Sequence, residues 1–390
     1  MEINVVSSTA MDTPTALKEI IGKVNGIVPS LVIAAFNTEL DGELISSELN
    51  AIFDCPIIGS SSCKGALTIT ASDANASASL ALFLINDPKG NYGVGHRELG
   101  EDPKTSAMEA LDMALYASDR GYESPTLIWC MLPPGAEESI LEGFSEVVGS
   151  NVPVFGGSSA DNDVSGQWQQ LTDVSAGTNQ ICVAVLYPST APGISFSSGY
   201  EPTETTLTVT SCEGRLLKTL DNVTAANRYD EIIKGTITPY LSGGNILALT
   251  TLHPFGRKIT TADGIEDYLL SHPDAINEYG ELSLFSKIEE GEHLFLMQGS
   301  RQNLLRRANR VIKNATELLP EGAKPKGILM IYCAGCMLTI EDELAIMLEA
   351  LQQENQGIPI FAIYTFGEQG CFLDGQNRHG NLMISAVAFD

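Results

Sequence analysis

The chain has 390 residues, 44% of them hydrophobic and 18% charged, a composition that provides for packed cores and excludes a disordered chain or a coiled coil. Its 49 acidic and 22 basic residues give a net charge of −27, which repels phosphate backbones and anionic lipid headgroups, so we expect neither nucleic-acid nor membrane-surface binding. No apolar run reaches the ~20 residues that a membrane span needs, and the first residues do not form a signal peptide. Eight scattered cysteines in a chain of this length indicate reduced thiols, so a cytoplasmic protein is expected.

Three segments share one plan: an apolar strand, a helix, and a second apolar strand that begins just after a proline. They read LVIAAF…CPIIGSSS, TLIWCML…VPVFGGSS and GILMIYC…IPIFAIYT, with prolines at 56, 153 and 359 and predicted helices over 44–52, 137–148 and 341–353. Continuous apolar strands are typical of sheets covered on both faces. We therefore predict an α/β fold of two related halves, whose mixed β-sheets pack together between helices in αββα-like layers, with degenerate β-α-β repeats.

The stretches between these segments have other patterns. Residues 178–212 alternate between apolar and polar side chains and predict strands. Residues 301–319 predict an amphipathic helix, residues 380–390 predict a final strand, and the residues that follow 212 predict a helix. Because this change follows a strand-rich stretch, we place a domain boundary near residue 213.

Four stretches together resemble the FIST family, whose members carry paired N- and C-terminal FIST domains. They are GSSSCKGALT at 59–68, ISFSSGYEPTETTLTVTSCEG at 194–214 with LDNVTAANRYDEII after it, IYCAGCM at 331–337, and IPIFAIYTFGEQG followed by QNRHGN. The resemblance covers roughly residues 28–390. It implies a lead-in at 1–27, a FIST N-terminal domain at 28–212 and a FIST C-terminal domain at 213–390.

The resemblance further implies a non-catalytic sensory protein of bacterial signal transduction. Small ligands such as amino acids or carboxylates, and a separate signalling partner such as a histidine kinase, are expected. Some relatives bind haem and respond to nitric oxide, which gives an alternative in which His253 is the first histidine to test. Ser198 stands where relatives often have a histidine, and His379 is displaced by one position, so the family's haem pattern is incomplete. No resident cofactor is expected.

The turns after the prolines are the strongest ligand-site candidates, because closely spaced glycine N–H groups and hydroxyls can cradle an anion. The alternative is that glycine and serine only make tight turns. Asp161 and Asn162 could bind an ammonium group or cap a helix. Glu368 and Arg378 would suit a zwitterion, or could be ordinary surface residues. The complete predicted ligand site is Ser60, Ser61, Ser62, Gly157, Ser158, Ser159, Asp161, Asn162, Cys333, Tyr364, Thr365, Glu368, Arg378 and Asn381, in which Cys333 is a pocket residue by family resemblance.

Cys333 and Cys336 form a C-x-x-C that follows a strand, and a thiol redox protein is therefore a further alternative. Thr339 and Asp342 have the spacing of a capping box, so the next helix is predicted to begin only there, three residues past Cys336, which diminishes the effect of the helix terminus on the thiols. No second such pair and no H-x-x-x-H occurs, so no metal site is expected. We recognise no catalytic motif.

Basic residues gather on the predicted helix at 301–319. We expect them to form a solvated face that pairs with carboxylates; the alternative is a docking face for an acidic partner. The residues are Arg301, Arg306, Arg307, Arg310 and Lys313.

Overall fold

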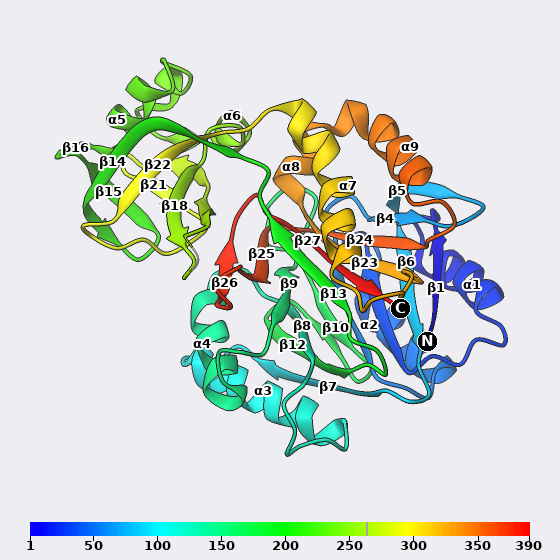
Figure 1. Ribbon diagram of the computed structural model, residues 1–390. Coiled ribbons are helices and arrows are strands. Elements are labelled where there is room, and N and C mark those ends of the chain that lie inside the picture. Colours follow the sequence, from blue (N-terminus) through cyan, green and yellow to red (C-terminus); the bar gives the residue numbers. More distant parts are fainter. Residues whose placement is uncertain (263) are drawn as a thin grey trace.

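The computed structural model describes residues 1–262 and 264–390. It is a mixed α/β protein with several mixed sheets flanked by helices, as predicted (Figure 1). Within these residues there are three six-stranded sheets and one nine-stranded sheet. The six-stranded sheets follow one plan, because three consecutive parts of the chain repeat the same order of elements.

Unit 1 spans residues 2–86 and unit 2 spans residues 91–187. Unit 1 comprises β1 (Glu2–Ser8), α1 (Thr13–Lys23), β2 (Leu31–Phe36), α2 (Gly42–Ile52), β3 (Ile57–Ser61), the hairpin β4 (Ala66–Ile69) and β5 (Ala74–Ala78), and β6 (Leu80–Asn86). Unit 2 comprises β7 (Asn91–Glu98), α3 (Pro103–Ala117), β8 (Leu127–Leu132), α4 (Glu137–Val148), β9 (Val154–Ser158), the hairpin β10 (Gln170–Thr172) and β11 (Ala176–Gly177), and β12 (Gln180–Tyr187).

Unit 3 spans residues 193–389 and contains an insertion at residues 201–298. Its own elements are β13 (Gly193–Ser197), α7 (Arg301–Glu317), β23 (Gly327–Cys333), α8 (Ala334–Thr339), η2 (Glu341–Glu343), α9 (Leu344–Glu354), β24 (Ile360–Thr365), the hairpin β25 (Gly367–Cys371) and β26 (Asn377–Gly380), and β27 (Ile384–Phe389). The insertion lies at the upper left of Figure 1, in green and yellow, and forms the nine-stranded sheet.

The insertion begins with a long strand and is otherwise made of short elements. They are β14 (Glu201–Glu213), β15 (Leu216–Leu220), β16 (Val223–Thr224), α5 (Ala225–Ile232), η1 (Thr238–Tyr240), β17 (Gly244–Asn245), α6 (Leu247–Thr250), β18 (Phe255–Thr260), β19 (Glu266–Ser271), β20 (Pro273–Ile276), β21 (Leu282–Leu284) and β22 (His293–Gln298).

Each unit has a parallel strand pair at the centre of its sheet, and these pairs are the three predicted β-α-β segments. β2 pairs with β3, β8 with β9, and β23 with β24. The proline carbonyl before each second strand accepts a hydrogen bond from the first strand, at 2.9–3.0 Å. Proline cannot donate a backbone hydrogen bond to the strand ladder, but at the start of a strand it is tolerated because its carbonyl can still accept one.

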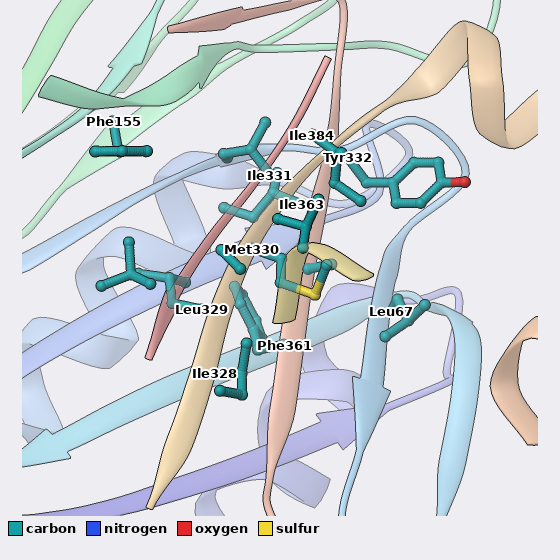
Figure 2. Close-up of a cluster of buried hydrophobic side chains, with 14 of the residues drawn as sticks. Leu67, Phe155, Ile328, Leu329, Met330, Ile331, Tyr332, Phe361, Ile363 and Ile384 are labelled. Atoms are coloured by element: carbon teal, nitrogen blue, oxygen red, sulfur yellow. The ribbon is translucent and has the colours of Figure 1, made fainter. Parts of the chain in front are cut away.

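The units exchange their hairpins in a cycle. The hairpin β4–β5 of unit 1 pairs with β24 of unit 3, β10–β11 of unit 2 pairs with β3 of unit 1, and β25–β26 of unit 3 pairs with β9 of unit 2. Each sheet is therefore completed by a neighbouring unit. Figure 2 shows the resulting shared core, in which Leu67 of β4 and Phe155 of β9 lie with the apolar side chains of β23 and β24.

Gly156 shows how closely the paired strands approach one another. Its φ is +152°, and an added Cβ would lie 1.9 Å from the carbonyl oxygen of Cys130 on the neighbouring strand. Only glycine fits such a contact.

Two helix predictions are wrong, for identifiable reasons. The residues after 212 do not form a continuous helix, because Leu216–Leu220 is strand β15 paired with β14, and the helix α5 begins only at Ala225. The Thr339–Asp342 capping box is absent. Thr339 instead ends α8 and its hydroxyl donates to the Gly335 carbonyl at 2.8 Å. The helix that Thr339 ends, α8, begins directly after Cys333, earlier than predicted.

The basic residues of α7 divide into two groups. Arg301 pairs with Glu343 at 2.6 Å, and Lys313 lies 3.8 Å from Glu317, as the solvated-face prediction requires. Arg307 does not follow it, because its side chain is 1% exposed and lies inside the protein.

Candidate functional site

The three units meet where their second parallel strands end. At equivalent positions, each turn donates one backbone hydrogen bond to a neighbouring unit, and the three bonds form a ring. They run from Ala160 N–H to Ser61 O at 3.4 Å, from Phe366 N–H to Ser158 O at 3.0 Å, and from Cys63 N–H to Tyr364 O at 3.2 Å. Carboxyl ends of parallel strands are where α/β folds place ligands, and here three such ends converge.

A cavity of about 250 Å³ lies at this meeting point. The turns of the three units contribute Cys63, Asn162, Asp163, Val164 and Phe366, other parts of unit 3 contribute Cys333, Gly335, Leu338, Asn381 and Leu382, and the insertion contributes Asn245, Leu247, His272 and Phe285. The wall is therefore shared between the three-unit body and the insertion. Ligand sites are commonly found at such junctions.

Asn381 and His272 join the body to the insertion at this wall. The Asn381 side-chain oxygen accepts from the His272 N–H at 3.2 Å, and the Asn381 N–H donates to the Leu270 carbonyl at 3.2 Å. The side-chain nitrogen of Asn381 is buried and has no partner among the described residues. It is a free hydrogen-bond donor in a residue that lines the cavity.

His272 is a neutral group in this wall. Its Nε2 lies 2.9 Å from the Thr250 hydroxyl. Burial lowers the pKa of His272 to about 4, because desolvation disfavours the imidazolium.

Three of the predicted site residues line the cavity: Asn162, Cys333 and Asn381. The serines around them lie in or next to the strand ends, and four of the five make internal hydrogen bonds. The Ser60 hydroxyl donates to Ser61 O, Ser61 accepts from Gln169 N–H, Ser62 accepts from Tyr364 N–H, Ser158 donates to Glu137, and the Ser159 hydroxyl is buried without a partner among the described residues.

The remaining predicted residues are not among those that line the cavity. The Asp161 carboxylate accepts from four N–H groups of its own loop, and Gly157 packs against Thr365. The Tyr364 hydroxyl donates to the Ala76 carbonyl. The described structure does not bring Glu368 and Arg378 together as a clamp. Glu368 is buried against Thr365 and the Met383 N–H, while Arg378 forms a bidentate pair with Asp374.

A buried cation lies behind the cavity. Nη1 of Arg307 donates to the carbonyls of Ser198 and Leu382, both at 2.8 Å, and its guanidinium lies 4.7 Å above the Tyr332 ring. Nε and Nη2 have no hydrogen-bond partner among the described residues. Burial raises the pKa of the nearby Glu368 carboxyl well above its usual range, because desolvation disfavours the charged form.

Cys336 is fully buried in the same region, 3.5 Å from the Tyr200 hydroxyl. Burial opposes ionisation of its thiol, but the Cys333 thiol, the Arg307 charge and Tyr200 together bring the pKa of Cys336 below its usual range. Burial raises the pKa of Cys333 well above that range. The pair therefore holds one readily ionised sulfur and one protonated sulfur.

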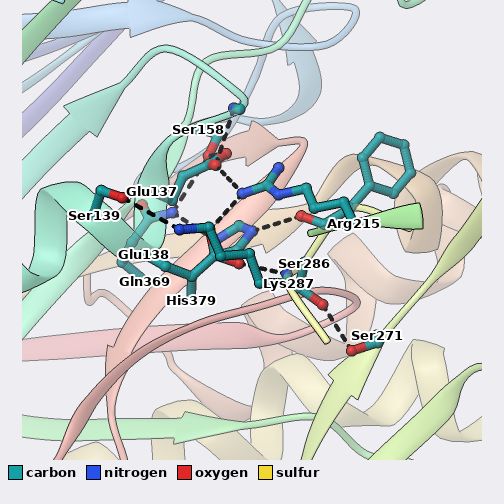
Figure 3. Close-up of polar contacts among 12 residues, drawn as sticks. Glu137, Glu138, Ser139, Ser158, Arg215, Ser271, Ser286, Lys287, Gln369 and His379 are labelled. Carbon is teal, nitrogen blue, oxygen red and sulfur yellow. Dashed lines mark hydrogen bonds and ion pairs between the residues drawn. The ribbon is translucent and has the colours of Figure 1, made fainter. Parts of the chain in front are cut away.

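A polar network holds the insertion against α4 on the other side of the cavity wall (Figure 3). Arg215 reaches Glu137 at 2.6 Å and Glu138 at 2.7 Å, and Glu138 also accepts from the Lys287 N–H. His379 lies 3.1 Å from Gln369 and 3.0 Å from the carbonyl of Phe285, a cavity residue. Charged contacts between the insertion and unit 2 thus lie within a few residues of the cavity.

The residues present do not fit haem. His253 is not among the residues that line the cavity, and its carbonyl accepts from the Tyr229 hydroxyl in the insertion. The histidine that does line the cavity already contacts Thr250 through Nε2. We therefore assign no role to a haem iron.

Comparison with models of protein families matches the FIST N domain to residues 30–223 and the FIST C domain to residues 225–371. The chain belongs to the FIST-domain family. FIST domains are associated with sensory signal transduction and ligand binding rather than catalysis. No curated protein matches the chain. No helix of the described FIST chain has the length and hydropathy to cross a membrane.

Sequence reasoning missed several residues of the cavity in this FIST protein. Cys63 and Phe366 occupy equivalent positions in two of the three turns, so aligning the internal repeat would have found them. No sequence pattern could have identified the four cavity residues of the insertion, because they line the cavity only through the packing of the insertion against the three units. They are Asn245, Leu247, His272 and Phe285.

Proposed function

We propose that this FIST protein is a sensor that binds a small, uncharged, mainly apolar molecule with a hydrogen-bond acceptor in the cavity between the three units and the insertion. The observation that carries the proposal is the shared wall. Residues of three equivalent turns and residues of the insertion line one cavity of about 250 Å³. Sites for drug-sized ligands measure ~300–1,000 Å³, so this slightly smaller cavity suits a ligand smaller than a typical drug.

The chemistry of the wall supports an uncharged ligand. Leu247, Leu338 and Phe366 give it an apolar surface, and the free Asn381 amide nitrogen offers a donor to a carbonyl or similar acceptor. Among the described lining residues there is no lysine or arginine, and Asp163 is acidic. A carboxylate would have no cation to pair with there. Amino acids and small carboxylates, predicted from the sequence, are therefore the comparison group in the test.

Ligand contacts to both sides of the wall would alter how the insertion sits on the body. A ligand shifts such an equilibrium only by its difference in affinity for the two arrangements. The ion pairs of Arg215 with Glu137 and Glu138 join the insertion to unit 2, so such a shift would strengthen or break them. We propose that a separate signalling protein in the cytoplasm reads the change. The eight free cysteines support a reducing compartment.

The test is a thermal-shift and calorimetric panel of small ketones, amides, amines, amino acids, carboxylates and haemin. A ligand at 100 times its Kd stabilises the folded state by about 2.7 kcal/mol, which raises Tm by roughly 5–11 °C for a domain of 150–250 residues. We expect a selective shift with a neutral acceptor ligand. A shift confined to carboxylates would contradict the ligand class proposed here.

A glycine pair provides the matched control. Gly335 lies in α8 at the cavity, where a Cβ has room, because its closest neighbours would be 3.7–4.0 Å away. Gly335→Leu should fill the cavity and abolish the ligand shift. Gly22→Leu changes a helical glycine in α1 with nothing within 4 Å and should leave the ligand shift intact. Equal ligand responses from the two variants would place the site elsewhere.

A further inference from the structure

We propose that Cys333 and Cys336 form a reversible dithiol–disulfide couple whose reduced form is stabilised by the buried Arg307 guanidinium. The couple is independent of the ligand proposed for the cavity, and either idea can fail without the other. It rests on the position of the two sulfurs and on a buried cation that lacks a carboxylate partner.

The buried cation is the first part of the argument. Arg307 is 1% exposed, and none of the ion pairs of the described residues includes it. Its Nη1 is satisfied by two backbone carbonyls, whereas Nε and Nη2 have no partner among those residues. A buried charge is expensive unless an anion compensates it. The carboxyl of Glu368 forms no ion pair with it among those residues, since its oxygens accept from the Thr365 hydroxyl and the Met383 N–H, and burial raises the pKa of Glu368 well above its usual range.

The second part is the sulfur that can supply the anion. Cys336 is fully buried, and its sulfur lies 3.5 Å from the Tyr200 hydroxyl. Burial opposes its ionisation, but the Cys333 thiol and then the Arg307 charge outweigh burial and lower the pKa of Cys336. Cys333 is the N-cap residue of α8 and Cys336 is its third residue. Side chains three positions apart at a helix start face each other, so the two sulfurs are placed to form a bond without a change of fold.

The third part is access. Cys333 lines the cavity and is 4% exposed, while Cys336 is 0% exposed. A small disulfide reagent can therefore approach Cys333 first. The Cys336 thiolate first takes the proton of the Cys333 thiol, because only a thiolate is nucleophilic enough to attack. The Cys333 thiolate then attacks one sulfur of the reagent, breaks the reagent S–S bond and forms a mixed disulfide. The first reagent thiolate leaves and takes the proton back from Cys336.

The Cys336 thiolate then attacks the Cys333 sulfur, closes the protein disulfide, and releases the second reagent thiolate, which takes its proton from water. Two electrons pass from the protein sulfurs to the reagent disulfide. The oxidised protein no longer has a thiolate beside Arg307. Because only the reduced form can hold an anionic sulfur in the region of this buried cation, the disulfide should be easily reduced, which is the behaviour of labile rather than structural disulfides.

The test equilibrates the full-length chain in mixtures of 2-mercaptoethanol and bis(2-hydroxyethyl) disulfide. After acid quenching and alkylation, chymotryptic cleavage after Tyr332 releases the C-x-x-C peptide for mass analysis. We expect a single reversible transition between two forms of this peptide. The dithiol form carries two alkyl groups, whereas the disulfide form carries none and is two hydrogens lighter than the unmodified dithiol. Cys63→Ser is the matched control, because Cys63 also lines the cavity and is 1% exposed, and it should leave the transition unchanged. Cys336→Ser should abolish it. Absence of the disulfide at every ratio would overturn the proposal.

Arg307 gives the decisive variant. Arg307→Gln should shift half-oxidation to a disulfide-to-thiol ratio at least about tenfold lower, equivalent to about 30 mV. Arg307→Lys keeps the positive charge and should return the ratio most of the way to the wild-type value. If Arg307→Gln does not fold, thiolate absorbance of the wild-type chain decides the matter. The difference between wild type and Cys336→Ser should titrate below the ~8.5 of an ordinary thiol. A midpoint at or above that value, or an unshifted redox ratio in a folded variant, would refute the role of Arg307.

Discussion

The side-chain oxygen of Asn381 accepts a hydrogen bond from the backbone N–H of His272 at 3.2 Å. This contact ties the last loop of unit 3 to the inserted sheet, and both residues line the cavity. The Asn381 amide is therefore one of the buried contacts that fix the insertion on the body.

Asn381→Ala should lower the free energy of unfolding by about 1–3 kcal/mol, because it leaves the buried His272 N–H without its acceptor. Chemical denaturation followed by circular dichroism measures the change. Asn314→Ala, an exposed asparagine of α7, should change stability by no more than about 0.5 kcal/mol. Similar losses in both variants would mean that the Asn381 contact contributes nothing specific.

Gly156→Ala should be severely destabilising, by at least about 3 kcal/mol, since it combines backbone strain with a steric clash. The added Cβ would lie 1.9 Å from the Cys130 carbonyl oxygen. Gly135→Ala is the matched control because Gly135 also has a positive φ, +122°, but nothing lies within 4 Å of its Cβ position. Urea midpoints of the two variants should differ clearly. A mild effect at Gly156 would show that β8 and β9 can separate at little cost.

Arg215→Met should cost about 3–5 kcal/mol because it leaves the buried Glu137 carboxylate without its cation. Glu137 is 2% exposed and also accepts from the Ser158 hydroxyl at 2.7 Å. Lys218→Met removes a cation that pairs with the exposed Glu213, and this surface pair is worth about 0–1 kcal/mol. If both variants unfold at the same denaturant concentration, Arg215 does not hold the insertion in place.

Glu138 should make stability fall in acid. Burial opposes ionisation of this carboxyl, but His379, Arg215 and the Lys287 N–H outweigh it and lower the pKa of Glu138 to about 2. A depressed carboxyl pKa stabilises the folded state above the unfolded value near 4.5, and this contribution disappears as pH falls toward 2. Glu138→Gln should flatten stability measured between about pH 4.5 and pH 2, by at most about 3 kcal/mol. If Glu138→Gln loses as much stability as the wild type between these pH values, the Arg215 contact does not stabilise the Glu138 carboxylate.

His272 should act in a higher pH window. Its folded pKa of about 4 lies below the unfolded value of 6.5, so the unfolded state binds the proton first and stability declines as pH falls from about 6.5 to 4. His272→Gln should weaken this decline without removing it, because burial also lowers the pKa of His96 and of His253. Unfolding midpoints across this range distinguish the two windows.

The sequence predicted the β-α-β segments well because each consists of short apolar strands and an amphipathic helix, both of which are local patterns. The helices over 44–52 and 137–148 correspond to α2 and α4. The exchange of hairpins was not predictable, because β4 pairs with β24 almost 300 residues away and nothing in either strand specifies that partner.

Site prediction was limited in the same way. Asn162, Cys333 and Asn381 belong to recognisable turns, and they line the cavity. Arg307 has the helical position and residue type of a surface cation, and only the packing of α7 against β13 and β27 places it inside the protein. The start of α8 was missed because a polar Thr-x-x-Asp spacing resembled a cap.

The cyclic hairpin exchange has a consequence for synthesis on the ribosome. The sheet built on β8 and β9 gains its last two strands from residues 367–380, and the sheet of unit 1 needs β10 and β11 from unit 2. While the chain is being translated, the strand edge of β9 stays open for the time needed to make some 200 more residues. Open edges of this kind are where chains associate wrongly, so the incomplete chain should be more prone to association than the finished protein.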